Sequence, residues 1–96
     1  MTTDTILAAA QAGYRRYYFG RPGHQWETEG NATRILWEQL AARVLNGEYT
    51  EAKHCHGFYN QLHANRVDWS DISTKTRMQW IGVLAVMQAV PAKEAA

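Results

Sequence analysis

The amino-acid sequence predicts an all-α fold, a compact bundle of about four helices. Apolar residues recur every three or four positions through most of the chain, and no segment shows the sustained apolar–polar alternation of a half-buried strand. The length of 96 residues, 46% of them hydrophobic, fits a single globular domain. We expect that domain to span residues 1–96, with a frayed tail from about residue 91 and helices over residues 4–19, 31–46, 51–64 and 74–90.

The first two helices are each predicted from an apolar stripe with an end signal. The stripe of the first helix consists of Ile6, Ala10, Tyr14, Tyr17 and Tyr18. Gly20 and Pro22 end this pattern, because glycine favours a helix terminus and proline cannot continue a helix. Asn31 is expected to cap the second helix, and the dipeptide "NG" at positions 46 and 47 ends it. The stripe of the second helix consists of Leu36, Leu40 and Val44.

The last two helices follow the same logic. Thr50 is expected to cap the third helix and Ser73 the fourth, because a side-chain hydroxyl can accept a hydrogen bond from a free amide of the first turn. Pro91 should stop the fourth helix. The buried face of the third helix is expected to contain Ala52, Cys55, Phe58, Tyr59 and Leu62.

The last predicted helix is apolar on every side, unlike a surface helix with one polar face. Either the other three helices enclose it completely, or part of it meets another molecule. In the second case the chain forms a homodimer, and we expect Trp80, Val83 and Met87 to contribute to self-association. A dimer would add apolar burial to a chain that is short for building a large core.

Two segments resemble each other within the chain. "TRILWEQLA" and "TRMQWIGVLA" share Thr, Arg and Trp at the same relative positions. Shared chemistry at the starts of two helices explains a match of this extent more simply than a true repeat does.

Charge and cysteine content narrow the partners and the compartment. The formal net charge is +1, so no bulk field attracts the protein to nucleic acid or to a membrane. The start lacks a basic segment and makes a poor secretory signal, and the apolar run over residues 78–90 is too short to span a bilayer. A single cysteine, Cys55, excludes an internal disulfide and fits a cytoplasmic location.

The stretch "YRRYYFGRPGHQW", residues 14–26, holds five aromatic rings and three arginines without one acidic residue. Tyrosine, tryptophan and arginine are enriched at protein interfaces, so one interpretation is a surface for a protein partner. Its expected contact residues are Arg15, Arg16, Tyr18, Arg21 and Trp26. The alternative is a nucleic-acid-binding module, with phosphates on the arginines and bases stacked on Trp26. A third interpretation is an ordinary helix end. In that case the tyrosine hydroxyls are exposed to solvent, and the arginines interact with the negative end of the helix dipole.

The segment "KHCHGFYNQLH" brings three histidines and Cys55 together in sequence without the spacing of a metal site. His54 and His56 project from opposite sides of a helix, and His63 lies two turns beyond His56. Cys55 falls on the apolar stripe, where a thiol is a small core residue. We therefore expect no metal, no cofactor and no catalytic residues, and a protein that is not an enzyme.

The segment "VDWSDISTKTRMQWIGVLAVMQ", residues 67–88, resembles the ending of small phage- and prophage-encoded helical accessory proteins. In that pattern Trp69 and Ile72 precede a capped helix that carries Arg77 and Trp80 in its first turns. The resemblance covers about a quarter of the chain and assigns no active residues. It implies an accessory protein that works by binding, as a phage-encoded modulator or inhibitor of a host protein.

Overall fold

The protein folds into four α-helices, which confirms the predicted all-α class. The computed structural model describes residues 2–62 and 66–95, and these contain no strand. Two short 3-10 helices, η1 (Trp26–Thr28) and η2 (Trp69–Asp71), lie in the loops before the second and the fourth α-helix. The α-helices are α1 (Thr3–Tyr17), α2 (Asn31–Leu45), α3 (Ala52–Gln61) and α4 (Thr74–Ala95).

The helix starts differ from the predicted caps by one residue at two places. Gly30 and Glu51 stand at the N-cap positions of α2 and α3, in place of the predicted Asn31 and Thr50. Ser73 caps α4 as predicted, because its Oγ accepts a hydrogen bond from the Thr76 amide at 3.2 Å. The first helix ends at Tyr17, two residues early, and residues 63–64 of the third predicted helix lie outside the described residues.

The prediction that Pro91 ends the last helix is wrong. The helix α4 continues through Pro91 to Ala95, so residues 91–95 are helical where a frayed tail was expected. A proline lacks the amide donor and its ring crowds the carbonyl four residues back, but the residues after it can still donate to carbonyls of the preceding turn. The proline therefore costs stability near the end of α4 without ending the helix.

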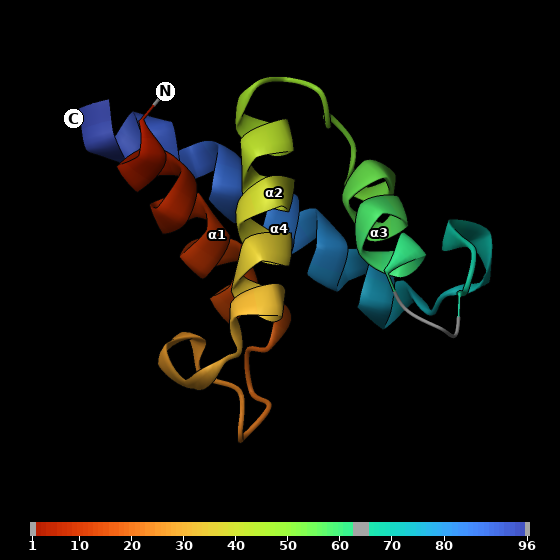
Figure 1. The fold of residues 1–96 in the computed structure, drawn as a ribbon. Coiled ribbons are helices and arrows are strands. Elements are labelled where there is room, and N and C mark those ends of the chain that lie inside the picture. Colours follow the sequence, from red (N-terminus) through yellow and green to blue (C-terminus); the bar gives the residue numbers. More distant parts are fainter. Residues whose placement is uncertain (1, 63–65, 96) are drawn as a thin grey trace.

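Three helices cover one side of α4. Figure 1 shows α1, α2 and α3 on the same side of α4, with α1 antiparallel to it and the two chain ends close together. The helices α1 and α4 can pack closely because Gly13 has no side chain and leaves room for that of Met87. A Cβ added at Gly13 would lie 3.2 Å from Cγ of Met87. The outer side of α4 stays open, because Met78 and Ile81 are 54% and 46% exposed.

Aromatic rings from three helices surround the fully buried Trp37 of α2. Tyr14 and Tyr17 of α1 have ring centroids 6.0 and 5.7 Å from that of Trp37, and Tyr59 of α3 lies at 5.9 Å. Trp80 of α4 stacks on Trp37 at 6.1 Å, with the ring planes 13° apart. Aromatic pairs at such distances add stabilisation beyond the area that they bury. The four helices therefore meet in one aromatic core.

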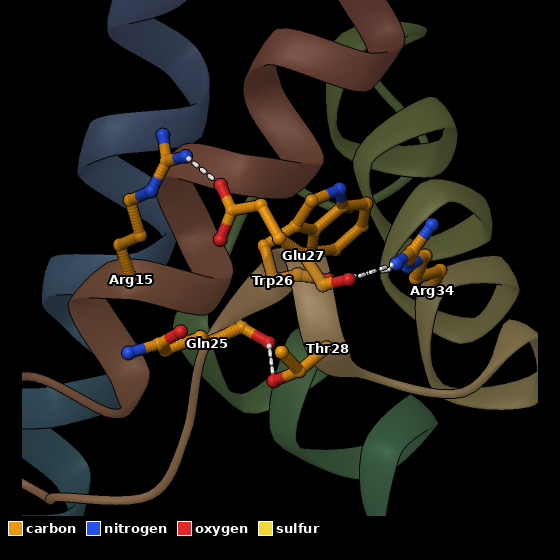
Figure 2. A network of polar contacts seen from close by, with 6 residues as sticks. All are labelled: Arg15, Gln25, Trp26, Glu27, Thr28 and Arg34. Carbon is orange, nitrogen blue, oxygen red and sulfur yellow. Dashed lines mark hydrogen bonds and ion pairs between the residues drawn. The ribbon is translucent and has the colours of Figure 1, made fainter.

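The two segments that resemble each other in sequence build the same local structure. Arg34 of α2 donates from Nε to the Trp26 carbonyl at 3.1 Å and from Nη2 to the Glu27 carbonyl at 2.7 Å (Figure 2). Arg77 of α4 donates in the same way to the Trp69 and Ser70 carbonyls, at 3.2 and 2.8 Å. Each guanidinium thus fastens a 3-10 turn to the helix that follows it, which is the shared helix-start chemistry expected from the sequence.

The described helices form one packed body. The radius of gyration is 12.8 Å, and a folded chain of this length is expected to have about 12.5 Å. Within the described ranges, none of the helices combines the length and the apolar character that crossing a bilayer requires.

Candidate interaction surface

The chain turns sharply at the end of α1. Tyr18 closes the helix by donating its amide to the Tyr14 carbonyl at 3.0 Å, and the Arg21 amide then donates to the Tyr18 carbonyl at 2.9 Å. Gly20 and Gly23 have φ angles of 78° and 88°, a backbone region that side chains with a Cβ rarely adopt. The two glycines therefore shape a tight loop, residues 18–25, which projects beyond α1 (Figure 1).

Phe19 lies at the tip of this turn and is 82% exposed, the highest exposure of any large hydrophobic side chain among the described residues. It was not among the predicted partner contacts. One signal in the sequence could have singled it out, since Phe19 lies off the stripe of Tyr14, Tyr17 and Tyr18 and directly precedes Gly20. A single exposed apolar side chain is ordinary on a protein surface, so Phe19 matters here for the apolar contact area that it offers next to Arg21.

Contacts of His24 with Tyr18 and Glu29 connect the loop to the core. The His24 ring stacks on the Tyr18 ring with centroids 4.1 Å apart and planes 15° apart. Nδ1 of His24 lies 3.6 Å from Oε1 of Glu29, and the same carboxylate oxygen accepts a hydrogen bond from the Tyr14 hydroxyl. Burial raises the pKa of Tyr14, and the Glu29 carboxylate raises it further because it disfavours a second negative charge.

The Arg21 side chain is exposed at the same loop. Its guanidinium carbon lies 5.4 Å from the centre of the Tyr17 ring, within the range of a cation–π contact. Tyr18 is half-buried, and its hydroxyl lies 3.4 Å from that of Tyr59 on α3. These contacts fix the base of the loop and leave the Arg21 charge accessible.

Trp26, a predicted partner contact, is buried in the free chain and so offers little surface to a partner. Its exposed fraction is 6%, and its ring packs edge-on against Tyr14 with centroids 5.5 Å apart. The 3-10 turn that Arg34 fastens directs this ring inward (Figure 2). The tryptophan therefore belongs to the core.

The two arginines of α1 point to different places. Arg15 is exposed and forms an ion pair with Glu27, with 3.3 Å between Nη2 and Oε1 (Figure 2). Arg16 instead lies against α4: a Cβ added at Gly82 would be 2.6 Å from its guanidinium carbon. Three of the five predicted contact residues, Arg15, Tyr18 and Arg21, thus remain at the loop end of the molecule. We call the exposed residues Arg15, Phe19, Arg21, Pro22 and His24, together with half-buried Tyr18, the loop surface.

The residues predicted for self-association point into the protein. Trp80, Val83 and Met87 are almost fully buried within their own chain, so they offer little surface to the second copy expected from the sequence. Trp80 packs against Tyr17 and Trp37, and Met87 fills the space beside Gly13. These three side chains point inward because the neighbouring helices bury their apolar area.

In α3, His54 forms hydrogen bonds at the start of the helix, and Cys55 lies in the core. His54 accepts hydrogen bonds at Nδ1 from the amides of Thr50 and Glu51, at 3.3 and 3.2 Å. Cys55 is completely buried, which raises the pKa of its thiol to about 11. Among the described residues no three potential ligands lie close enough to share a metal ion, and His63 is outside them.

A second apolar feature lies away from the loop. A shallow cavity of about 360 Å³ opens between α2 and the end of α3. Ile35 and Leu62, both on its wall, are 50% and 59% exposed. The sequence did not predict this cavity, because it depends on how the two helices are placed.

Comparison of the chain with protein-family models, curated sequences and solved structures finds no significant match.

Proposed function

We propose that this protein is a non-enzymatic binding protein that contacts a protein partner through the loop surface. The observation that carries the proposal is the exposure of Phe19, at 82%, at the tip of a turn that the core holds in place. Protein interfaces are enriched in aromatic and arginine side chains, and Phe19 and Arg21 stand two residues apart in this turn.

The way the loop is anchored supports a role in binding. Stacking of His24 on Tyr18 and the cation–π contact of Arg21 already restrict the loop in the free protein. A partner then has fewer side chains to immobilise, so less of the binding free energy is lost to ordering. This preorganisation supports the proposal that the exposed Phe19 ring binds a partner.

Two observations weigh against the nucleic-acid alternative. The ring expected to stack on bases, Trp26, is buried. Near the loop, Arg15 pairs with Glu27, and His24 lies beside Glu29, so negative charge accompanies the positive charge. Phosphate binding depends on exposed, uncompensated positive charge, and of the arginines in the loop surface only Arg21 lacks an ion pair among the described residues.

The finer proposal concerns the biological setting. The resemblance of residues 67–88 to phage-encoded accessory proteins supports a host protein as the partner, with inhibition or modulation as the effect. The single, buried Cys55 supports a cytoplasmic setting, where thiols stay reduced.

The test is capture of a partner from bacterial lysate on the immobilised protein, with and without nuclease. Wild-type protein and the variants Phe19→Ala and Leu62→Ala are compared, because Leu62 is a similarly exposed apolar side chain at the α2–α3 cavity. We expect wild type to capture the same partner protein with and without nuclease. Leu62→Ala should still capture this partner, and Phe19→Ala should not. Loss of all captured material on nuclease treatment, or equal capture by Phe19→Ala, contradicts the proposal.

A further inference from the structure

The similarity of the two helix starts extends to the whole of each half of the chain. Each half consists of an α-helix, a loop, a 3-10 turn and a second α-helix, in the same order. The two turns begin at residues 26 and 69 and the helices after them at residues 31 and 74, so both pairs are 43 positions apart. The halves therefore share one spacing from the turn onward.

The aromatic contacts inside the first half occur again inside the second half. In each half, the tryptophan of the second helix contacts two rings of the first helix. The pairs of the first half are Trp37–Tyr14 and Trp37–Tyr17, with 6.0 and 5.7 Å between ring centroids. The equivalent pairs of the second half are Trp80–His56 and Trp80–Tyr59, at 6.1 and 5.1 Å. Because these partner rings lie on α1 and α3, shared chemistry at the starts of α2 and α4 does not account for them.

The contacts between the halves are reciprocal. Trp37 of the first half contacts Tyr59 of the second half at 5.9 Å, and Trp80 of the second half contacts Tyr17 of the first half at 4.8 Å. Trp37 and Trp80 stack on each other, and the rings of Tyr17 and Tyr59 meet with centroids 5.3 Å apart. Under two-fold symmetry a residue meets its own equivalent at the axis and every other contact occurs twice. The ring contacts follow this rule.

We infer that the chain is an internal repeat, in which two copies of one helix–turn–helix unit pack about a pseudo-two-fold axis between Trp37 and Trp80. Figure 1 shows α2 and α4 crossing in the middle of the molecule, with α1 on one side of the crossing and α3 on the other. Each unit supplies half of the aromatic core, so the protein is a single-chain counterpart of a small homodimer. This inference does not depend on the proposed function.

The two halves differ away from the axis. The helix α1 has 15 residues and α3 has 10, and α1 contacts α4 more extensively than α3 contacts α2. Equivalent rings are 42 positions apart in α1 and α3 and 43 apart from the 3-10 turns onward, so the loop of the second half is one residue longer. These differences leave the ring contacts at the axis in place.

The equivalence predicts a contact between Cys55 and Val44. Gly13 of α1 leaves room for Met87 of α4. The equivalent positions hold Cys55 in α3 and Val44 in α2, and both side chains are buried. A cysteine replaces the glycine and a smaller valine replaces the methionine, so the two pairs fill similar volumes. We therefore expect Cys55 and Val44 to pack together as Gly13 and Met87 do.

The first test measures urea midpoints of unfolding in two mutant cycles of the full chain. Met87→Val should lower the midpoint in wild type, because it leaves a gap beside Gly13, and should raise it in Gly13→Cys, where the added side chain needs the space. By the equivalence, Val44→Met should lower the midpoint in wild type and raise it in Cys55→Gly.

Val90→Met is the matched control, because Val90 is a buried valine close to the other end of α4. We expect it to change the midpoint equally in wild type and in Cys55→Gly. Opposite signs of the Val44→Met effect in the two backgrounds support the repeat. An effect of Val44→Met that is the same in both backgrounds overturns it.

A second test needs no variant. Proton NMR of the wild-type protein should show nuclear Overhauser effects between the Val44 methyl groups and the Cys55 side chain. Those between the Met87 methyl group and the Gly13 α-protons provide the reference, because this contact is present in the structure. A spectrum with the reference signals and without those of Val44 and Cys55 contradicts the two-fold arrangement.

Discussion

Two aromatic residues near the end of α1 differ in their exposure to solvent. Tyr14 is buried and donates a hydrogen bond to Glu29, whereas Phe19, five residues later, stands in solvent. The difference arises at Tyr18, where the helix ends and the chain turns away from the core. Residues before this point follow the helical stripe into the core, and residues after it belong to the loop.

At the scale of single residues, His56 should make the stability of the fold depend on pH. It is buried beside Trp69 and Trp80, and this burial lowers its pKa below the ordinary value, although the nearby Asp68 carboxylate acts in the opposite direction. Below about pH 6.5 the unfolded chain binds a proton at His56 that the folded chain resists. The stabilising contribution is thus complete above this pH and is lost as the pH falls.

We expect the free energy of unfolding, measured with urea between pH 7 and pH 5, to fall less steeply in His56→Phe than in wild type. Phenylalanine keeps an aromatic ring against Trp69 and Trp80 and does not titrate. An identical slope in the two proteins would show that His56 does not contribute to the acid sensitivity.

At the scale of elements, the paired arginines Arg34 and Arg77 fasten the starts of α2 and α4. Each guanidinium donates two hydrogen bonds to consecutive carbonyls of a 3-10 turn. A lysine ammonium cannot reproduce this planar fork.

Arg34→Lys and Arg77→Lys should therefore each lower the free energy of unfolding by about 1–2 kcal/mol, the scale of one or two lost hydrogen bonds. Arg66→Lys is the control, because the guanidinium of exposed Arg66 makes a single hydrogen bond of 3.3 Å, to the Gln61 carbonyl. Chemical denaturation measures all three variants. Equal, small effects in all three would contradict a special role for the two helix starts.

The helices themselves were predictable, but the orientation of α4 was not. The stripes Trp80–Val83–Met87 and Met78–Ile81–Ala85 have the same spacing, so periodicity alone cannot decide which one faces the core. The structure buries the first stripe, which holds the bulkiest ring and the side chain that fits beside Gly13. The end of α4 was missed for a different reason, since the rule that proline stops a helix is weak in a final turn.

At the scale of the whole molecule, Trp37 joins α2 to the rings of α1, α3 and α4. Its Nε1 is buried and has no hydrogen-bond partner among the described residues, so its contribution comes from packing. Trp37→Ala should lower the free energy of unfolding by about 3–5 kcal/mol, a large share of the total stability of a small domain.

Guanidinium denaturation followed by circular dichroism at 222 nm measures this change. Tyr49→Ala, which removes a half-buried ring outside the cluster around Trp37, should cost clearly less. A Trp37→Ala variant as stable as wild type would mean that the four helices do not share one core.

The candidate surface was only partly predictable from the sequence. Helix periodicity and the glycines locate the turn, so the sequence could place Arg15, Tyr18 and Arg21 near the end of α1, where the structure has them. The burial of Trp26 was not predictable, since its ring packs against Tyr14 of α1 and its carbonyl accepts a hydrogen bond from Arg34 of α2. Such contacts follow from how α1 and α2 pack together, which the local pattern does not contain.

The measurement that bears most directly on the proposed function is photo-cross-linking from position 19 in the cells that make the protein. A photoreactive benzoylphenylalanine replaces Phe19 in one variant and Leu62 in the control, and the captured products are identified by mass spectrometry. We expect one defined protein to be attached at position 19 and not at position 62. Cross-links to nucleic acid, or the same products from both positions, would contradict a protein-binding role for the loop surface.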